Sequence, residues 1–180
     1  CSIGKGTHRA ADRLQYWLRQ ADRKPNRHYY LKLDIAKYFY RIDHEMLIKV
    51  LRKKVADEEL IQLLENIINC ENTKFGIPIG IDADQCETED RLSDVGIPIG
   101  NLTSQMFANL YLNELDQYAK HTLKLHYYLR YMDDIIILHD DKKYLHEIKA
   151  TIENFLNDEL HLQLNKKTAI RPIKVGVEFV

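Results

Sequence analysis

Three aspartates stand at positions where a folded chain would need to neutralise them. Asp133 and Asp134 are adjacent and interrupt an otherwise apolar stretch, YMDDIIIL. Asp34 lies between Leu33 and Ile35 in a second strand-like segment, KLDIA. Carboxylates among apolar residues are poorly solvated and neighbouring ones repel, and divalent cations are the usual remedy. If the two segments are adjacent strands, the three acids meet at one point.

Three carboxylates from two neighbouring strands predict a site for hard divalent cations. In two-metal phosphoryl transfer, ions roughly 3.5–4 Å apart clamp the attacking and leaving oxygens. The alternative is that Asp133 and Asp134 only form the polar turn of a hairpin, because Asp is common in turns. The matching acid on the upstream segment favours the metal site.

Hydrophobic periodicity outlines the elements that must position these acids. Helices are predicted over residues 7–21, 43–55, 57–68, 101–121 and 142–157, with Thr7, Asp43 and Asp57 as the first three N-caps. A strand should end near Ile35, two strands should flank a tight turn at Met132–Asp133, and edge strands should follow residue 162. The inward residues of the third helix are expected to be Leu60, Leu64, Ile67 and Ile68. This order predicts an α+β fold with a sheet covered by helices on one side.

The pentapeptide GIPIG occurs twice, at residues 76–80 and 96–100. An acidic stretch, DADQCETEDRLSD, separates the two copies. We predict two paired strands joined by a solvated loop. Only the second copy continues into NLTSQ and a helix, so it is the copy expected to matter for function.

Composition and charge exclude several classes of protein. The 180 residues suit about one domain, and 45% hydrophobic content is enough for a core. The sequence contains no apolar run long enough to cross a membrane. Cys1, Cys70 and Cys86 fit neither a CxxC metal site nor a disulfide framework, which favours a reduced, cytosolic protein. Because the first residue is not Met, we expect a segment of a longer protein.

Charge is unevenly distributed although the net charge is only −1. Residues 1–54 carry 14 Lys/Arg against 5 Asp/Glu, whereas the remainder carries 12 against 22. This asymmetry suits a basic surface for a polyanion beside an acidic cluster that needs cations. Two solvated faces would give the same totals.

Several motifs together resemble those of prokaryotic reverse transcriptases. Residues 131–134, YMDD, match the YxDD box of the family's palm hairpin, and LDIAKYF at 33–39, followed by IDH, resembles its first metal-binding block. LNKKT at 164–168, followed by GVEF at 176–179, resembles the next block. In GIPIGNLTSQ, Ile99 and Gln105 replace the Gln and Pro of the usual QGxxxSP pattern. This variant is similar to the enzymes of diversity-generating retroelements, relatives of group II intron and retron reverse transcriptases.

The resemblance implies a polymerase palm, an antiparallel sheet with the YxDD hairpin packed on helices, plus partial fingers and no thumb. Residues 1–30 and 50–95 would be fingers, and residues 31–49 and 96–180 would be palm. The implied reaction is RNA-directed DNA synthesis, in which deoxynucleotides are transferred to a primer 3′ end with two Mg²⁺ ions, for which Mn²⁺ can substitute. Without thumb and complete fingers, the chain alone is expected to polymerise poorly.

The resemblance also implies residue roles. The catalytic set comprises Asp34, Asp133, Asp134 and Lys167, the last of which, or Lys166, would assist pyrophosphate departure. The metal ligands would be Asp34, Asp133, Asp134 and the carbonyl of Ile35. The nucleotide would meet Phe39 as a steric gate against the 2′-hydroxyl, Ile99, Gly100 and Tyr131. The template or primer would meet Lys5, Arg9, Ser104, Gln105 and Met132.

Purely structural roles remain open for some of these residues. Phe39 would also serve as a core residue, Ser104 would also form a hydrogen bond at a helix N-terminus, and Asp43 is expected to be a helix cap rather than a metal ligand. The implied partners are an RNA template, a DNA or RNA primer, deoxynucleoside triphosphates and a basic accessory protein, in a prokaryotic cytoplasm and without a membrane. A retron, group II intron or phage-defence reverse transcriptase is the alternative, as is a non-catalytic RNA-binding palm.

Overall fold

The computed structural model describes residues 6–69 and 74–177. The chain divides into two compact units. We name the first the sheet unit, which comprises Cys1–Ile35, Leu115–Phe155 and Gln163–Val180. We name the second the helical unit, which comprises Ala36–Glu114 and Leu156–Leu162. The predicted division into fingers and palm stays a prediction.

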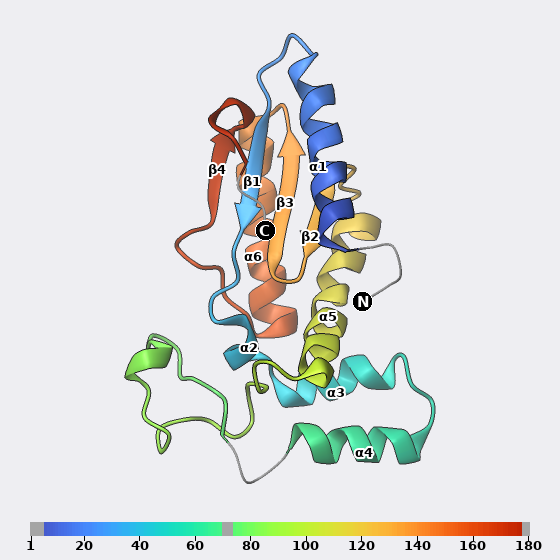
Figure 1. Cartoon of the computed structure of the whole chain (residues 1–180), viewed down its shortest axis with the longest axis vertical. Helices are drawn as coiled ribbons and strands as arrows, with labels where there is room; N and C mark the ends of the chain where they lie inside the picture. The colour runs from blue at the N-terminus through green and yellow to red at the C-terminus, as the bar shows by residue number, and fades with distance from the viewer. Residues whose placement is uncertain (1–5, 70–73, 178–180) are drawn as a thin grey trace. The chain divides into compact units, whose positions relative to one another are not determined.

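A four-stranded antiparallel sheet forms the centre of the sheet unit (Figure 1). Its strands are β1 (Tyr29–Leu33), β2 (Tyr128–Tyr131), β3 (Asp134–His139) and β4 (Ala169–Pro172), in the order β2-β3-β1-β4. Met132 and Asp133 alone join β2 to β3, with Tyr131 opposite Asp134. The predicted α+β fold with an antiparallel sheet and a tight YxDD hairpin is confirmed.

Both faces of this sheet are buried, because side chains of β1 and β3 alternate between two helices. On one face Leu14 of α1 (Thr7–Asp22) clusters with Tyr30, Ile136 and Leu138. Figure 1 shows α6 (Lys142–Leu160) on the other face. The residues of that face are at most 1% exposed: Leu31, Leu33, Ile135 and Ile137.

Two predictions for these elements are wrong. Helices cover both faces of the sheet rather than one, because the unbroken apolar run of β3 needs cover on each side. The N-cap of α1 is Gly6, and Thr7 is already the first helical residue. In α6, Leu145, Ile148 and Ile152 are buried.

The helical unit contains α2 (Tyr38–Arg41), α3 (His44–Arg52), α4 (Glu58–Ile68) and the first part of α5 (Leu102–Gln117). Asp43 caps α3 by accepting from the Met46 N–H at 2.9 Å, and Asp57 caps α4 in the same way, so both predicted caps are confirmed. Shorter helical turns are Ala83–Gln85, the π-helical Tyr118–Thr122 that follows α5, and Ile173–Val175.

The inward face predicted for α4 is partly wrong. Leu60 and Ile67 are 41% and 46% exposed, whereas Ile61 and Ile68 are buried. Apolar residues surround most of this helix, so periodicity does not single out the stripe that is covered. Among the described residues no helix is long and apolar enough to cross a bilayer. Cys86 is a buried free thiol, while Cys1 and Cys70 lie outside the described residues.

The two GIPIG copies do not form the predicted two-stranded hairpin. Only an isolated bridge, Gly76 to Leu92, joins their flanks, and the amides of Ile77 and Ile97 instead donate to the carbonyls of Tyr40 and Phe39. Each copy thus lines α2 and buries its first isoleucine, while Ile79 and Ile99 are exposed. The copies touch at their first glycines, because a Cβ on Gly96 would lie 2.7 Å from the Gly76 nitrogen.

This contact predicts unequal costs for matched substitutions. Gly96 and Gly100 both have positive φ, 88° and 100°, but only Gly96 lacks space for a Cβ. We expect Gly96→Ala to lower the free energy of unfolding by about 3 kcal/mol or more, and Gly100→Ala by about 1 kcal/mol. Urea denaturation of both variants measures the difference. Equal losses would show that the two copies do not pack against each other.

Candidate active site

Strand register brings the three predicted acids to one end of the sheet. Leu33 pairs with Ile135, so continuation of the same register places Asp34 beside Asp134. Residues 30, 32 and 34 share a face with 134, 136 and 138, because side chains alternate along each strand. Asp133 follows in the turn, and all three acids are half-buried. Two of the three like charges therefore share the α1 face of the sheet, and the third, in the adjoining turn, is close enough to act on Asp34.

The electrostatics of Asp34 reflect this crowding. Burial raises the pKa of the Asp34 carboxyl above its ordinary value of 3.8, and Asp133 and Asp134 raise the pKa further. The positive charges of Lys167 and Lys32 oppose the shift. Lys32 also lies 3.3 Å from Asp134, in a pair about one-third exposed. The protein thus supplies two cations to a site that holds three acids.

The donor set is of the type that Mg²⁺ prefers, because it offers several carboxylate oxygens and no thiolate or imidazole. In the part of the chain that the structure describes, however, no three His, Cys, Asp or Glu side chains already lie close enough together to hold a metal ion. The acids therefore fit a hard cation by chemistry and by their shared location. Metal binding would require their side chains, Asp134 above all, to turn away from their present partners.

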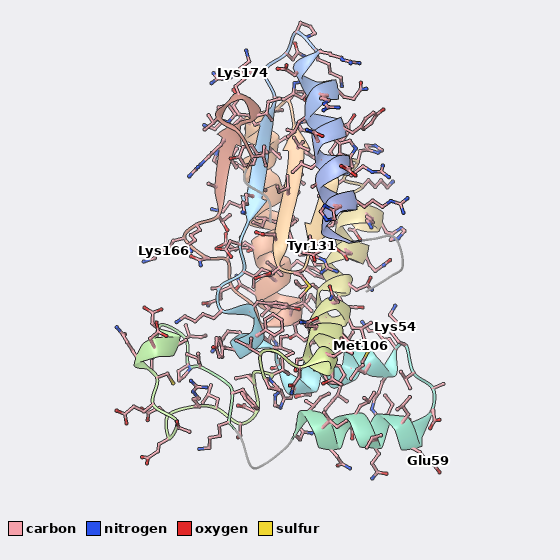
Figure 2. All side chains as sticks on the ribbon, viewed as in Figure 1. Lys54, Glu59, Met106, Tyr131, Lys166 and Lys174 are labelled. Carbon is pink, nitrogen blue, oxygen red and sulfur yellow. The ribbon has the colours of Figure 1, made fainter. Side chains whose placement is uncertain are left out.

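The LNKKT segment is tied directly to the backbone of Asp34. The Asn165 N–H donates to the Asp34 carbonyl at 2.7 Å, and the Asp34 N–H donates to the Thr168 hydroxyl at 3.2 Å. Leu164 bridges to Ile35, and the Asn165 side chain accepts from the Lys167 N–H, which shapes the turn. Lys167, and not Lys166, acts on the Asp34 carboxyl. Figure 2 shows Lys166 directed outward from the connection before β4.

A second network holds the YxDD turn. Arg130 forms a bidentate pair with Asp116, at 2.9 and 2.7 Å, and donates a third bond to the Met132 carbonyl at 2.8 Å. Tyr128 donates to the same Asp116 carboxylate at 2.8 Å. Met132 has a φ of 54°, which is unusual for a side chain of this size. Arg130 therefore anchors a strained turn from its carbonyl side.

The remaining predicted residues divide between the two units. Tyr131 and Met132 lie at the hairpin, as Figure 2 shows for Tyr131, and Ile35 directly follows Asp34 with 2% of its surface exposed. Arg9 is an exposed residue of α1. Lys5 and the last two residues of the GVEF block lie outside the described residues.

The predicted nucleotide and template contacts of the second GIPIG copy belong to the helical unit, as does Phe39. Phe39 is half-buried with its ring 5.6 Å from that of Tyr38. Ile99 and Gln105 are exposed and Gly100 has open space around it, whereas Ser104 is only 2% exposed, which favours its structural alternative. The roles of these residues stay predictions.

Sequence reasoning missed the residues that hold the acids in place. Arg130, Asn165 and Thr168 stand next to, or within, motifs that the sequence singled out, whereas Asp116 lies outside them. The bonds of Arg130 to Asp116, and of Asn165 and Thr168 to Asp34, join residues more than ten positions apart. Lys32 had a readable signal. A lysine two residues before Asp34 shares its strand face, and a charge on that face needs a counter-charge.

The Asp116 network predicts a graded loss of stability. The side chains of Arg130 and Asp116 are only 10% and 15% exposed, so Asp116→Ala leaves a buried guanidinium without its partner. We expect this substitution to lower the free energy of unfolding by about 3 kcal/mol, and Tyr128→Phe by about 1 kcal/mol. Urea denaturation provides the measurement. An Asp116→Ala variant as stable as the parent would contradict an anchoring role.

The raised pKa of Asp34 predicts that the acid destabilises the metal-free fold. The folded state holds the Asp34 proton more tightly than the unfolded state does. Protonation of Asp34 therefore stabilises the fold at low pH, and this stabilisation is lost as the pH rises above 3.8. We therefore expect Asp34→Asn to be more stable than the parent at neutral pH in a chelating buffer, with a difference that shrinks toward acid pH. Denaturation at several pH values tests this. A less stable Asp34→Asn variant at neutral pH would oppose it.

Comparison with known proteins places this geometry in a family. The sequence pattern of the family described as "Reverse transcriptase (RNA-dependent DNA polymerase)" matches residues 3–175. The COX1/OXI3 intron 2 protein of Saccharomyces cerevisiae is 30% identical over 84% of this chain. Protein YkfC of Escherichia coli is 28% identical over 47% of the chain. The chain spans only 23% and 19% of the lengths of these two relatives.

Solved structures agree on the fold. A telomerase from Candida tropicalis in complex with a TWJ fragment of telomeric RNA superposes with a TM-score of 0.67 and 16% identity, over 97% of this chain and 31% of its own. A telomerase from Candida albicans, also in complex with a TWJ fragment of telomeric RNA, gives a TM-score of 0.60 and 13% identity, over 91% and 29% of the two chains. At these identities the likeness concerns the fold alone. With the family pattern covering nearly the whole sequence, the chain belongs to the reverse transcriptase (RNA-dependent DNA polymerase) family.

Proposed function

We propose that the chain is the catalytic core of an RNA-directed DNA polymerase, which adds deoxynucleotides to a primer 3′ end on an RNA template. The observation that carries the proposal is the convergence of Asp34, Asp133 and Asp134 at one end of the sheet, in a chain of this family. The burial and like charges at Asp34 are unfavourable for the free protein, so they are better explained by a cationic ligand than by stability.

Divalent ions would be held by the three aspartates together with the carbonyl of Ile35. When bound, Mg²⁺ or Mn²⁺ would supply Lewis-acid stabilisation of the charge that develops on phosphate oxygens. Lys167 is the residue of this chain best placed to protonate or neutralise the departing pyrophosphate, because the Asn165 turn directs its charge toward Asp34. Lys32 balances Asp134 while no cation is bound.

The residues proposed for specificity and for template binding come from both units. Phe39 would exclude a ribose 2′-hydroxyl, and Ile99, Gly100 and Tyr131 would border the incoming nucleotide. Arg9, Gln105, Ser104, Lys5 and Met132 are the proposed template or primer contacts. The support for Ile99 and Gln105 is their exposure beside a glycine with open space around it.

Within the family, we propose a diversity-generating retroelement enzyme of a prokaryotic cytoplasm, working with a basic accessory protein. Ile99 and Gln105 within GIPIGNLTSQ support this narrower assignment. The second candidate is an intron-encoded reverse transcriptase, which the similarity to the COX1/OXI3 intron 2 protein favours. Copying errors opposite template adenines would distinguish the two candidates, because such errors are expected of a diversity-generating retroelement enzyme.

The catalytic proposal predicts a large effect of a small substitution. In the complete protein, Asp133→Asn should reduce extension of a primer on an RNA template by about 100-fold or more, because it removes one negative charge and little volume. Extension with deoxynucleotides and Mg²⁺ measures the effect. We expect little synthesis from these 180 residues alone.

Asp57→Asn is the matched control, because Asn also caps helices well and Asp57 only caps α4. This control should synthesise DNA at the parental rate. Mn²⁺ binding to parent and Asp133→Asn forms a second measurement, and binding should weaken in the variant. Undiminished synthesis and Mn²⁺ binding by Asp133→Asn would contradict the role proposed for Asp133. Absence of synthesis by the complete parent protein would leave a non-catalytic RNA-binding palm as the better interpretation.

A further inference from the structure

The sheet unit contains a hollow at the end of the sheet opposite to the three acids. It has a volume of about 120 Å³ and is lined mainly by apolar atoms, with Trp17, Tyr127 and Leu138 at its centre. An enclosed apolar cavity of ~150 Å³ accepts benzene, so this smaller but open hollow holds only part of a planar ring system and leaves the rest outside it. Tyr127 is 40% exposed, which leaves the hollow open to solvent.

Two aromatic side chains shape the hollow for a flat ligand. The rings of Trp17 and Tyr127 are 5.5 Å apart at 79°, so the edge of one faces the plane of the other. Because Arg13 lies over the Trp17 ring, 6.0 Å from its centroid, the 40% exposed ring of Tyr127 is the one available for stacking. Nucleobases stack on aromatic side chains with little dependence on sequence, because every base has a π-face.

The rim of the hollow carries cations with no acidic partner. Lys24 lines the hollow, and Arg27 and Lys142 line the adjoining depression, which shares Asp140 with it. In the described ranges none of these three cations forms an ion pair with a carboxylate.

The acids of the rim are already engaged. Asp140 lies 3.3 Å from His139, and Asp141 accepts from the Lys143 and Tyr144 amides at the start of α6. Three cations against these two carboxylates leave the rim a small positive excess, which suits a polyanion that passes over an apolar ring site.

The hollow is separate from the reacting groups. It lies beside His28 and His139, at the opposite ends of β1 and β3 from Asp34 and Asp134. Five residues of strand separate Tyr29 from Asp34, which corresponds to roughly 17 Å. A ligand here would be a nucleotide distant from the one that is added.

We propose that this hollow binds one unpaired nucleobase of single-stranded RNA, with the flanking phosphates on Lys24, Arg27 and Lys142. The choice of RNA rests on the proposed function, since a polymerase that copies RNA must hold the strand beyond its reacting end. Binding itself needs neither the metal ions nor the three acids.

Trp17 is the only tryptophan of the chain, so its fluorescence reports on this hollow alone. We expect a short oligoadenylate to quench Trp17 about twofold, and inorganic polyphosphate, which has charge but no bases, to leave the emission unchanged. AMP at the same base concentration should quench far less, because it lacks the flanking phosphates. Equal quenching by AMP would make this a mononucleotide site and overturn the strand proposal.

Variants separate this inference from the catalytic one. Lys24→Glu should weaken oligoadenylate binding, measured by quenching, about tenfold, whereas Lys54→Glu, an exposed lysine of the helical unit shown in Figure 2, should not. Asp34→Asn should abolish DNA synthesis in the complete protein and leave quenching of the 180-residue chain intact. Loss of synthesis without any quenching in the parent would retain the polymerase and reject the hollow.

The anisotropy of end-labelled oligoadenylate provides an independent measure of binding. Binding by anisotropy with no change in Trp17 emission would place the RNA elsewhere and overturn the proposal. So would Trp17 emission that responds to protein concentration instead of RNA, because the occupant would then be a second copy of the chain.

Discussion

The convergence of three negative charges at one end of an apolar sheet is the constraint on which the site depends. Nothing local to Asp34 requires an acid there, since the preceding β1 residues are positioned by their pairing with β3 and β4. Strand register alone decides that its carboxyl meets those of the hairpin, and a slip of one residue would turn it to the opposite face. The pairing of the strands therefore holds the three carboxylates together although their mutual repulsion is unfavourable.

Supporting contacts surround this arrangement on two sides. One side is the Asp116–Arg130 pair, which holds the hairpin at the Met132 carbonyl. The other is the 165–168 turn, which forms hydrogen bonds with the backbone amide and carbonyl of Asp34. Each uses polar groups with low exposure or main-chain bonds, so each resists the repulsion between the acids without touching their carboxylates. Of the three acids, Asp134 is paired with Lys32, so a cation would have to replace that lysine.

Much of this site was predictable from local sequence, because its signals are local. The two-residue turn follows from DD between an alternating segment and an apolar run, and the strand that ends in Asp34 follows from its aromatic and β-branched residues. The caps Asp43 and Asp57 are equally local. Each of these features depends on a handful of neighbouring residues.

The failures concern long-range partners. The GIPIG segments have strand-like composition, yet they do not pair with each other as strands. Instead, the amides of Ile77 and Ile97 donate to the carbonyls of Tyr40 and Phe39 in α2, which lie about forty and sixty residues earlier in the sequence. Apolar residues on α4 outnumber those that are covered, so the pattern alone did not identify Ile61 as buried. Partner choice across such separations is decided by packing, which a single sequence does not display.

The bonds between Asp34 and the 165–168 turn have a mechanical consequence. The amide and the carbonyl of Asp34 bond to Thr168 and Asn165, the residues on either side of the Lys166–Lys167 pair, so main-chain contacts connect the acid to the segment that carries Lys167. A movement of one segment would therefore displace an anion and a cation together. Insertion or deletion within the turn would break this connection, so the length of the turn governs the spacing of the two charges.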